Sequence, residues 1–271
     1  MKSICDLHTH STASDGQYAP AELVSMAHSR GIEVLALTDH DTVDGVEEAV
    51  RAGEALGMRV IRGIELSARE YPTFHILGYG FRPDAPALAA LCADMKAGRD
   101  RRKYRMLDYL RDQGVPITLE EVEAVCGGEI VARPHFARVL VARGYVSTNR
   151  EAFDRYLDTP EFHARVERKK PSAAECVEIL KAAGGVVSLA HPYQTGLPAD
   201  ELEELVRKMA GWGLDAIECY YPKYSPEQQA LYLSLAERYG LHITGGSDFH
   251  GEKVKPEISL ARLSLDLSWL P

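Results

Sequence analysis

The sequence predicts an α/β protein, built as a seven-stranded (β/α) barrel with an α-helical insertion. Short apolar runs alternate with amphipathic segments in residues 1–84, the pattern becomes helical throughout residues 85–170, and the alternation resumes in residues 171–271. Strands that alternate with helices form a parallel sheet with right-handed crossovers, and seven of them indicate a closed or nearly closed barrel. We therefore expect residues 1–84 and 171–271 to form one barrel domain that is interrupted by a helical insertion at residues 85–170.

The first barrel segment contains four predicted strands and two predicted helices. Pro20 suits the first turn of a helix, and Gly31 and Gly57 end the two helices. The run 32–37 is almost continuously apolar, as is typical of a parallel strand covered on both faces. The strands are expected at residues 3–7, 32–37, 59–64 and 73–79, and the helices at 20–30 and 43–56.

Helical patterns fill the insertion, and strands return after it. Capping boxes indicate helix starts at Thr118, Ser172 and Ser225, each of which has a Glu or Gln three residues later. Helices are expected at residues 87–112 (as one helix or two), from 118, at 134–143 and at 151–157, and after the insertion at 172–184, 200–211 and 225–239. The remaining strands are expected at residues 186–190, 214–217 and 241–244.

Composition excludes several classes of protein. The chain has 271 residues, a net charge of −9 and a hydrophobic content of 45%, which is ordinary for a globular protein. No apolar run reaches about eighteen residues, so no membrane-spanning helix is expected. Met1–Ser3 leads directly into the first strand and leaves no room for a signal peptide. Five scattered cysteines without a CxxC pair favour free thiols in a reducing cytoplasm.

The charge is unevenly distributed along the chain. Residues 85–171 contain 16 Lys and Arg against 13 Asp and Glu, a net charge of +3, so the rest of the chain carries −12. A basic segment of this kind is suited to an anionic substrate. Two differently solvated surfaces would produce the same imbalance, so the charge alone does not separate the two interpretations.

Imidazoles and carboxylates collect where the predicted strands end. In barrels of this kind the C-terminal strand ends and their loops form the active site. His8 and His10 are two residues apart, so a strand directs both side chains the same way. The complete set is His8, His10, Asp15, Asp39, His40, Glu65, His75, His191, Glu218, Asp248 and His250. One ion uses about four to six ligands, so this set indicates two or three bridged ions. Nitrogen and oxygen ligands without thiolate favour Mn, Zn or Fe.

These residues occur in short motifs with a distinctive order and spacing. The motifs are His8-Thr-His10, Ser14-Asp15-Gly16, Thr38-Asp39-His40-Asp41, Gly63-Ile64-Glu65, His75-Ile-Leu-Gly78, Ala190-His191-Pro192 and Gly246-Ser247-Asp248-Phe249-His250. Together they resemble the PHP (polymerase and histidinol phosphatase) family over residues 1–80 and 171–251. The resemblance implies a distorted (β/α)7 TIM-like barrel, a trinuclear metal site and phosphoesterase activity. The insertion and its Val131-Ala-Arg133-Pro-His135-Phe motif resemble the branch with 3′,5′-nucleoside bisphosphate phosphatases and 5′-3′ exoribonucleases acting on short RNA.

The resemblance also implies which residues bind each ion. One ion would take His8, His10, Glu65 and Asp248, a second would take Glu65, His75 and His191, and a third would take Asp15, His40 and His250. The roles of two further carboxylates stay open. One interpretation of Asp39 is that it orients a metal ligand, and one interpretation of Glu218 is that it closes the barrel end. His191 and His250 are the candidates for protonating the leaving group, provided that they are not fully committed to metal.

Cations that hold the substrate are expected in the insertion, which would act as a substrate cap. Arg133 and His135 flank Pro134 at a predicted helix start, where backbone amides and the helix dipole favour an anion. Arginine suits bidentate contact with phosphate. Arg101 and Arg102 lie on a helix of which only part can face the site, and a solvated helix face is the alternative for them.

The predicted activity is that of a cytoplasmic phosphoric ester hydrolase with three divalent ions, Mn ahead of Zn or Fe. The ions would neutralise the phosphoryl oxygens, and a metal-bound hydroxide would release the 3′-phosphate of nucleoside 3′,5′-bisphosphates. Alternatives are a 5′-3′ exoribonuclease on short 5′-phosphorylated RNA, a histidinol phosphatase, and a metal-sensing or structural barrel without activity. The expected partner is a nucleotide or short RNA, with neither DNA nor membrane, and the chain is expected to be a monomer or small homo-oligomer.

Overall fold

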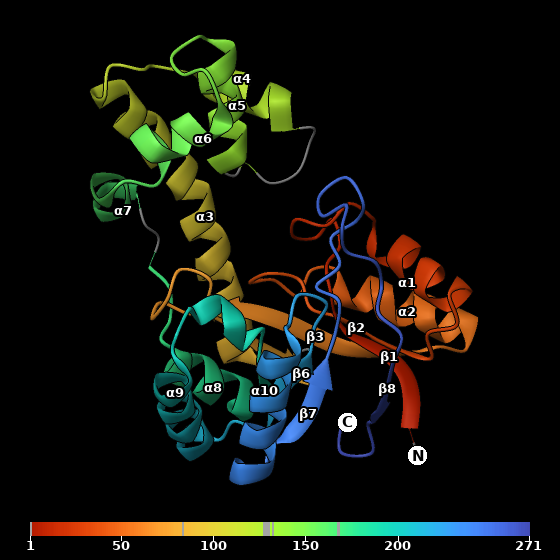
Figure 1. The fold of residues 1–271 in the computed structure, drawn as a ribbon. Helices are drawn as coiled ribbons and strands as arrows, with labels where there is room; N and C mark the ends of the chain where they lie inside the picture. Colours follow the sequence, from red (N-terminus) through yellow and green to blue (C-terminus); the bar gives the residue numbers. More distant parts are fainter. Residues whose placement is uncertain (1, 83, 127–130, 132, 167–168) are drawn as a thin grey trace. The chain divides into compact units, whose positions relative to one another are not determined.

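The computed structural model describes residues 2–82, 84–126, 131, 133–166 and 169–271. It contains two compact units (Figure 1), which we call the barrel unit and the helical unit. The barrel unit comprises Met1–Ala93 and Lys170–Pro271, and the helical unit comprises Asp94–Lys169. Ala132, which lies in the arginine motif of the insertion, is outside the described residues.

The described part of the barrel unit contains one sheet of eight strands, in the order β7-β6-β5-β4-β3-β2-β1-β8. The strands are β1 (Lys2–Thr9), β2 (Val34–Leu37), β3 (Arg59–Ser67), β4 (His75–Tyr79), β5 (Val186–Leu189), β6 (Ala216–Tyr220), β7 (His242–Gly245) and β8 (Leu263–Asp266). Neighbours pair in parallel from β1 to β3 and from β5 to β7. The α/β class and the nearly closed barrel that the sequence predicted are therefore confirmed.

Two strands depart from the expected parallel pattern. β4 runs antiparallel to both β3 and β5, because the connection 68–74 is too short for a helical crossover, which needs about a dozen residues or more. The chain therefore returns beside β3 as a hairpin. β8, which was not predicted, pairs antiparallel with β1. The expectation of seven strands, all parallel, is wrong on these two points.

The chain beyond β7 closes the barrel against β1. The backbone N–H of His10 donates to Phe249 O at 2.9 Å, and the N–H of Asp248 donates to His8 O at 2.8 Å. Gly246 makes this approach possible, because a Cβ at that position would lie 2.4 Å from His8 Cβ. The two ends of the motif set, at the beginning and near the end of the chain, are thereby joined.

Among the residues that the structure describes, five α-helices lie entirely within the barrel unit. They are α1 (Pro20–Ser29), α2 (Val46–Leu56), α8 (Ala173–Ala182), α9 (Ala199–Trp212) and α10 (Pro226–Tyr239), and a 3₁₀ helix, η2 (Pro192–Thr195), lies between β5 and α9. The predicted capping boxes at Ser172 and Ser225 are present. Helices α1 and α2 lie side by side (Figure 1) and pack with Leu35 and Leu37 of β2 in one apolar core. Helices α8 to α10 share another core with Ile217 of β6.

The helical unit has an apolar core of its own, which includes Tyr109, Leu110, Phe136 and Phe162. Its elements are the greater part of α3 (Pro86–Asp112), then α4 (Leu119–Cys126), α5 (Arg133–Ala142), α6 (Asn149–Ala152), the π-helix η1 (Phe153–Leu157) and α7 (Pro160–Val166). Residues 86–112 form one helix rather than two. The short helix expected at 151–157 begins in α6 and continues as the π-helix η1. Helix α7 was not predicted.

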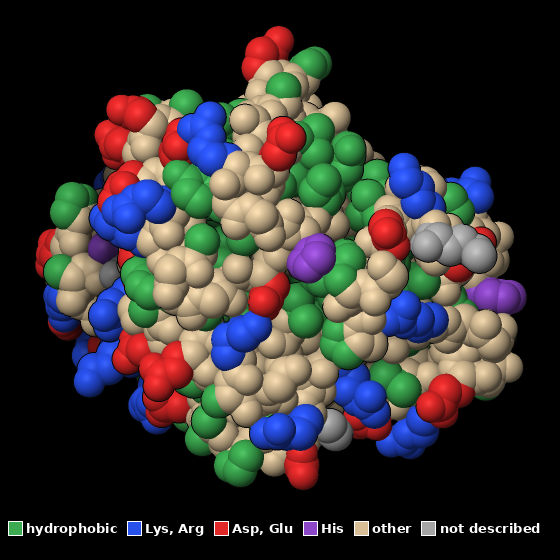
Figure 2. Space-filling model, turned by 90° about the horizontal axis from the view of Figure 1, so that it is seen from below, with side chains coloured by type: hydrophobic (Ala, Val, Ile, Leu, Met, Phe, Trp, Pro, Cys, Tyr) green, Lys and Arg blue, Asp and Glu red, His purple; other side chains and the backbone are tan. Residues whose placement is uncertain are grey.

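Charged side chains of both signs are interspersed over the face drawn in Figure 2. On that face the described Lys and Arg side chains do not form one broad basic surface. Within the described residues, no helix is long and apolar enough to cross a membrane.

Candidate metal centre

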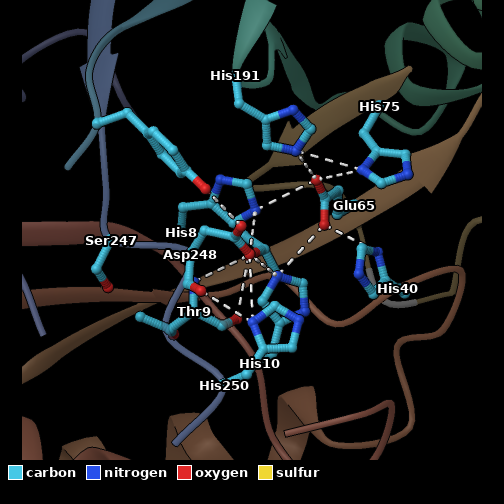
Figure 3. A network of polar contacts seen from close by, with 12 residues as sticks. His8, Thr9, His10, His40, Glu65, His75, His191, Ser247, Asp248 and His250 are labelled. Carbon is cyan, nitrogen blue, oxygen red and sulfur yellow. Dashed lines mark hydrogen bonds and ion pairs between the residues drawn. The ribbon is translucent and has the colours of Figure 1, made fainter. Parts of the chain in front are cut away.

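A single buried carboxylate, Glu65 on β3, lies at the centre of the candidate site (Figure 3). Five imidazole nitrogens surround its two oxygens. Oε1 lies 3.3 Å from His8 Nε2, 2.9 Å from His75 Nδ1 and 2.8 Å from His191 Nε2, and Oε2 lies 3.3 Å from His10 Nε2 and 2.9 Å from His40 Nδ1. The nitrogens therefore converge on one point at the end of the barrel.

The strand arrangement explains this convergence. His8 lies at the C-terminal end of β1, His10 directly follows that strand, and His191 follows β5. His75 is the first residue of β4, and because β4 is antiparallel, its beginning lies level with the C-terminal ends of β3 and β5. His40 is held by an isolated bridge to Glu65. The reversed strand thus delivers its histidine to the expected end of the barrel.

Two further carboxylates extend the cluster beyond Glu65. Asp248 Oδ1 lies 3.2 Å from His10 Nε2 and 3.3 Å from His250 Nδ1. Asp15 Oδ1 lies 3.2 Å from His250 Nε2, and Asp15 Oδ2 lies 3.8 Å from His40 Nε2. Asp15 has a half-exposed side chain, whereas that of Asp248 is only 4% exposed. The cluster therefore runs from a buried centre to a solvent-accessible edge.

The structure brings all nine predicted ligands together. Among the described side chains, three overlapping groups have ligand atoms within 4.8 Å of one another, namely His10, Asp15, His40 and His250, then His8, His10, Glu65 and Asp248, and then His40, Glu65 and His75. His191 joins the third group, because its Nε2 lies 2.8 Å from Glu65 and 3.3 Å from His75 Nδ1. The grouping resembles the three expected ligand sets, with His10 also beside the third set.

The donor atoms fit divalent ions. His8 Nε2 and both ring nitrogens of His10 are buried and form no hydrogen bond. Burial and the neighbouring His250 and His40 rings lower the pKa of His10 to about 4, and burial lowers the pKa of His75 to about 4 despite Glu65. Both rings are therefore neutral at pH 7 and present a lone pair, which is the form that binds a metal ion.

Charge within the cluster is strongly coupled. Burial raises the pKa of Glu65, but the imidazoles of His75, His40 and His8 outweigh it and hold that pKa well below its ordinary value. Burial alone would raise the pKa of Asp248, but its neighbours His10, His8 and Lys255 outweigh burial and hold that pKa well below its ordinary value. Both carboxylates are thus anionic at neutral pH and can bind cations.

The structure defines the surroundings of Glu218 and Asp39, whose roles the sequence left open. Glu218 is buried, accepts the His191 N–H at 2.7 Å and lies 3.0 Å from His8 Nδ1. It therefore orients the His8 ring so that Nε2 faces Glu65. Asp39 accepts hydrogen bonds from the backbone N–H and hydroxyl of Ser11 and from the Ser14 hydroxyl. It holds the loop that carries Asp15.

Two further buried carboxylates, which the sequence did not predict, accept hydrogen bonds from the segments beside the site. Asp6 accepts the backbone N–H and hydroxyl of Ser247 at 2.9 and 2.6 Å, and Asp41 accepts the same two groups of Ser67 at 2.8 and 3.1 Å. In each case a serine is paired with an aspartate from another segment of the barrel unit, as also occurs with Asp39. Such pairs are separated widely in sequence, so only the fold reveals them.

Backbone strain also marks this end of the barrel. Among the described residues, the non-glycine residues with positive φ are Asp41 at 56°, His191 at 22° and Asp248 at 56°. Each follows a parallel strand, respectively β2, β5 and β7. Conformations of this kind cost about 1–3 kcal/mol each and concentrate at functional sites. The strain therefore points to the same place as the ligand chemistry.

The four predicted substrate-binding residues all belong to the helical unit. Arg133, at the start of α5, donates to Asp158 Oδ1 at 2.7 Å and to Leu157 O at 3.3 Å. The Arg102 guanidinium lies over the Phe162 ring, 6.0 Å from its centroid.

Arg101 is exposed on α3, and His135 lies in the first turn of α5 with a pKa lowered by burial. His163 Nε2 lies 3.0 Å from Asp158 Oδ1, the oxygen that also accepts from Arg133.

Comparison with known proteins agrees with this site. The model of the PHP domain matches residues 6–161. A 5′-3′ exoribonuclease from Haemophilus influenzae is 37% identical over 90% of this chain and 89% of its own length. A 3′,5′-nucleoside bisphosphate phosphatase from Chromobacterium violaceum is 34% identical over 90% of this chain and 86% of its own length.

A solved structure shows the same fold. It is a Bifidobacterium adolescentis protein assigned as a metal-dependent phosphoesterase, which is 35% identical with a TM-score of 0.78 and covers 97% of this chain and 92% of its own. Together, the matched domain, the relatives and the imidazole–carboxylate cluster identify the chain as a phosphoric ester hydrolase. The chain therefore belongs to the PHP domain family of metal-dependent phosphoesterases.

Proposed function

We propose that the chain hydrolyses the 3′-phosphate of nucleoside 3′,5′-bisphosphates with three divalent ions, Mn²⁺ ahead of Zn²⁺ or Fe²⁺. The relative named for this reaction supports the substrate, and the nitrogen and oxygen donors support these metals. In the proposal the ions take the three ligand sets that the family resemblance implies. Glu65 is shared by two of them.

The observation that carries the proposal is the crowding of imidazoles around Glu65. Neutral rings such as His10 and His75 present lone pairs as well as N–H groups, and a lone pair repels a carboxylate oxygen. Five imidazole nitrogens lie within 3.3 Å of the two Glu65 oxygens. Cations bound between them would attract both the nitrogen lone pairs and the carboxylate oxygens, and would thereby stabilise the cluster. Bound ions would supply charge neutralisation for the phosphoryl oxygens and acidify water.

The ligand role and the acid role exclude each other at one ring nitrogen, because a nitrogen that binds an ion carries no proton. His191 directs Nε2 at Glu65, and His250 directs Nε2 at Asp15. We therefore assign both residues to metal binding. The protonation of the leaving group by His191 or His250 stays an alternative that would require one ring to leave its ion.

Phosphate release from adenosine 3′,5′-bisphosphate tests the proposed reaction. Purified protein with Mn²⁺ should release inorganic phosphate, His191→Ala should abolish the release, and His28→Ala, an exposed residue at the end of α1, should match the wild type. Phosphate release by the wild type no faster than by His191→Ala would refute the proposal.

A second candidate is stepwise 5′-3′ hydrolysis of short 5′-phosphorylated RNA, which the exoribonuclease relative favours. Specificity constants for the bisphosphate, a 5′-phosphorylated oligoribonucleotide and histidinol phosphate would rank the candidates. The net charge of +3 in residues 85–171 favours the two multiply charged anions over histidinol phosphate, which carries its own positive charge. A non-enzymatic metal-sensing barrel is set aside, because the relatives are named as hydrolases.

Contact between the substrate and the helical unit is part of the proposal. Arg133, His135, Arg101 and Arg102 are proposed to bind phosphate, which would make this unit a substrate cap. In the structure the Arg133 guanidinium pairs with the Asp158 carboxylate, so in this proposal a substrate phosphate replaces Asp158 as its partner. The cytoplasmic location and the small oligomeric state stay predictions.

A further inference from the structure

We propose that Lys255 and Tyr221 are positioning residues for the divalent cation that Asp248 binds. They hold one carboxylate oxygen of Asp248, so that the other faces the imidazoles of His8 and His10. The inference rests on the proposed metal centre and adds two residues that lie outside the nine predicted ligands. Neither residue contacts the ion in this assignment.

The two oxygens of Asp248 have separate partners. Oδ2 accepts hydrogen bonds from Lys255 Nζ at 2.7 Å and from the Tyr221 hydroxyl at 3.0 Å. Oδ1 faces His10 Nε2 at 3.2 Å and His8 Nε2 at 3.7 Å. Lysine therefore does not stand in for an ion among the imidazoles, since it binds the oxygen on the other side. A carboxylate held in this way presents a single oxygen to a cation.

Burial gives this arrangement energetic weight. The side chain of Asp248 is 4% exposed and Tyr221 is 7% exposed, whereas the Lys255 side chain is 28% exposed. An anion buried to this extent requires donors, and a charge-assisted hydrogen bond is about twice as strong as a neutral one. Lys255 thus connects the buried carboxylate to the surface of the site while compensating its charge.

The sequence after His250 is built to bring Lys255 back over the site. Gly251 has φ +98°, and a Cβ there would lie 2.3 Å from Gln17 Cβ, so glycine permits an immediate reversal of the chain. The backbone N–H of Lys255 then donates to Gly251 O at 2.9 Å, which closes a turn. Ile258, which is 2% exposed, anchors the end of the turn in the core shared with α1 and α2.

An ion pair connects the same turn to the segment that follows β6. Glu257 Oε1 lies 3.0 Å from Nζ of Lys223, which follows Tyr221 by two residues. The turn 251–258 and the segment after β6 are thus tied together next to Asp248. The two donors therefore approach Oδ2 from two segments that are linked to each other by this ion pair.

Manganese binding to the whole chain tests the inference without a substrate. Isothermal titration calorimetry of the metal-depleted protein would be compared for the wild type, Lys255→Met, Tyr221→Phe and the double variant. Changes around a metal ligand typically cost 10–100-fold in metal affinity. We expect about 10-fold weaker binding at one of the ions for Lys255→Met, and a greater loss in the double variant than the two single losses predict, because either donor alone partly holds Oδ2. Lys253→Met, an exposed lysine two residues earlier, should bind as the wild type does.

Two further readouts separate positioning from other roles. Lys255→Arg keeps a charged donor and should recover most of the affinity, and raising Mn²⁺ should restore kcat in Lys255→Met without a change in KM. A raised KM with unchanged metal affinity would instead mean that Lys255 contacts the substrate, and it would overturn the inference. Affinities within twofold of the wild type in the double variant, with unchanged melting, would overturn it as well.

The outcome also distinguishes this inference from the proposed function. A wild type that binds Mn²⁺ but does not hydrolyse the bisphosphate would refute the proposed substrate and leave the binding comparison valid. A wild type that binds no Mn²⁺ would refute the proposed metal centre and, with it, the positioning role of Lys255 and Tyr221.

Discussion

Replacing Glu218 by Gln should weaken metal binding although Glu218 is not a proposed ligand. The carboxylate is buried on β6, with Oε1 3.0 Å from His8 Nδ1 and Oε2 2.7 Å from the His191 N–H. A proton on Nδ1 of His8 leaves the lone pair on Nε2, the nitrogen that faces Glu65. Glu218 thus selects the tautomer of His8 that can bind an ion.

The size of the effect follows from the two ways in which the glutamine amide can be placed. If its oxygen accepts the His191 N–H, its NH₂ faces His8 Nδ1 and moves the ring proton to Nε2, which removes the ligand. If the amide is reversed, the NH₂ opposes the buried His191 N–H, which costs about 1–3 kcal/mol. We expect a 10–100-fold loss of metal affinity, or about 1.4–2.7 kcal/mol.

Competition with a fluorescent chelator would measure this affinity, and thermal unfolding in excess chelator would measure the stability of the metal-free chain. Glu237→Gln, an exposed glutamate on α10, is the matched control and should change neither quantity. Glu218→Ala should also destabilise the metal-free protein, because two buried N–H groups lose their acceptor. Manganese affinity of Glu218→Gln within twofold of the wild type, with unchanged melting, would refute the tautomer argument.

Three other predictions concern the whole chain, the helical unit and one buried carboxylate. Removing the ions with chelator should lower the melting temperature by about 5–10 °C if they are present at about 100 times their Kd, because that binding contributes about 2.7 kcal/mol; a shift below 1 °C would contradict the metal centre. Arg133→Ala should raise KM about 10-fold through the loss of a charged hydrogen bond. Its metal content should equal that of the wild type and of the control Arg150→Ala, which changes an exposed arginine on α6; loss of metal would show that Arg133 has another role. Burial raises the pKa of Asp6 from 3.8 to about 6, despite hydrogen bonds from Ser247. The folded protein therefore binds a proton at Asp6 more tightly than the unfolded chain does. The stability that this protonation contributes is fully present below pH 4 and is lost as the pH rises through about 6. Asp6→Asn should remove about 3 kcal/mol of this pH dependence in denaturant titrations from pH 4 to 7, and equal slopes for both proteins would contradict the assignment.

The sequence predicted the elements well where local signals agree with the fold. The capping boxes at Ser172 and Ser225 mark real helix starts, and the apolar run at 34–37 is a buried strand. The parallel direction expected for β4 was wrong, because periodicity identifies a strand but does not give its orientation. Only the length of the connection 68–74 carried that information.

The candidate ligands were predictable for a chemical reason. Histidine and carboxylate residues at strand ends are unusual enough to be noticed, and the closed sheet brings those ends together whichever way one strand runs. His75 shows this well, since it reaches Glu65 from the beginning of an antiparallel strand. Lys255 carried no comparable signal, because a lysine in a surface turn is ordinary until Gly251 is seen to reverse the chain towards Asp248.

The residues that hold the ligands in place could not be predicted for a different reason. Asp41 and Asp248 both have φ of 56°, at an energetic cost that the surroundings must offset. Asp41 receives two hydrogen bonds from Ser67, and Asp248 receives two from Lys255 and Tyr221. In each case these hydrogen bonds stabilise the strained residue through its own side chain. The carboxylates of Asp41 and Asp248 therefore each hold their own backbone in the strained conformation through these hydrogen bonds. Periodicity and motif spacing do not reveal such pairs, because they depend on contacts between segments that are distant in sequence.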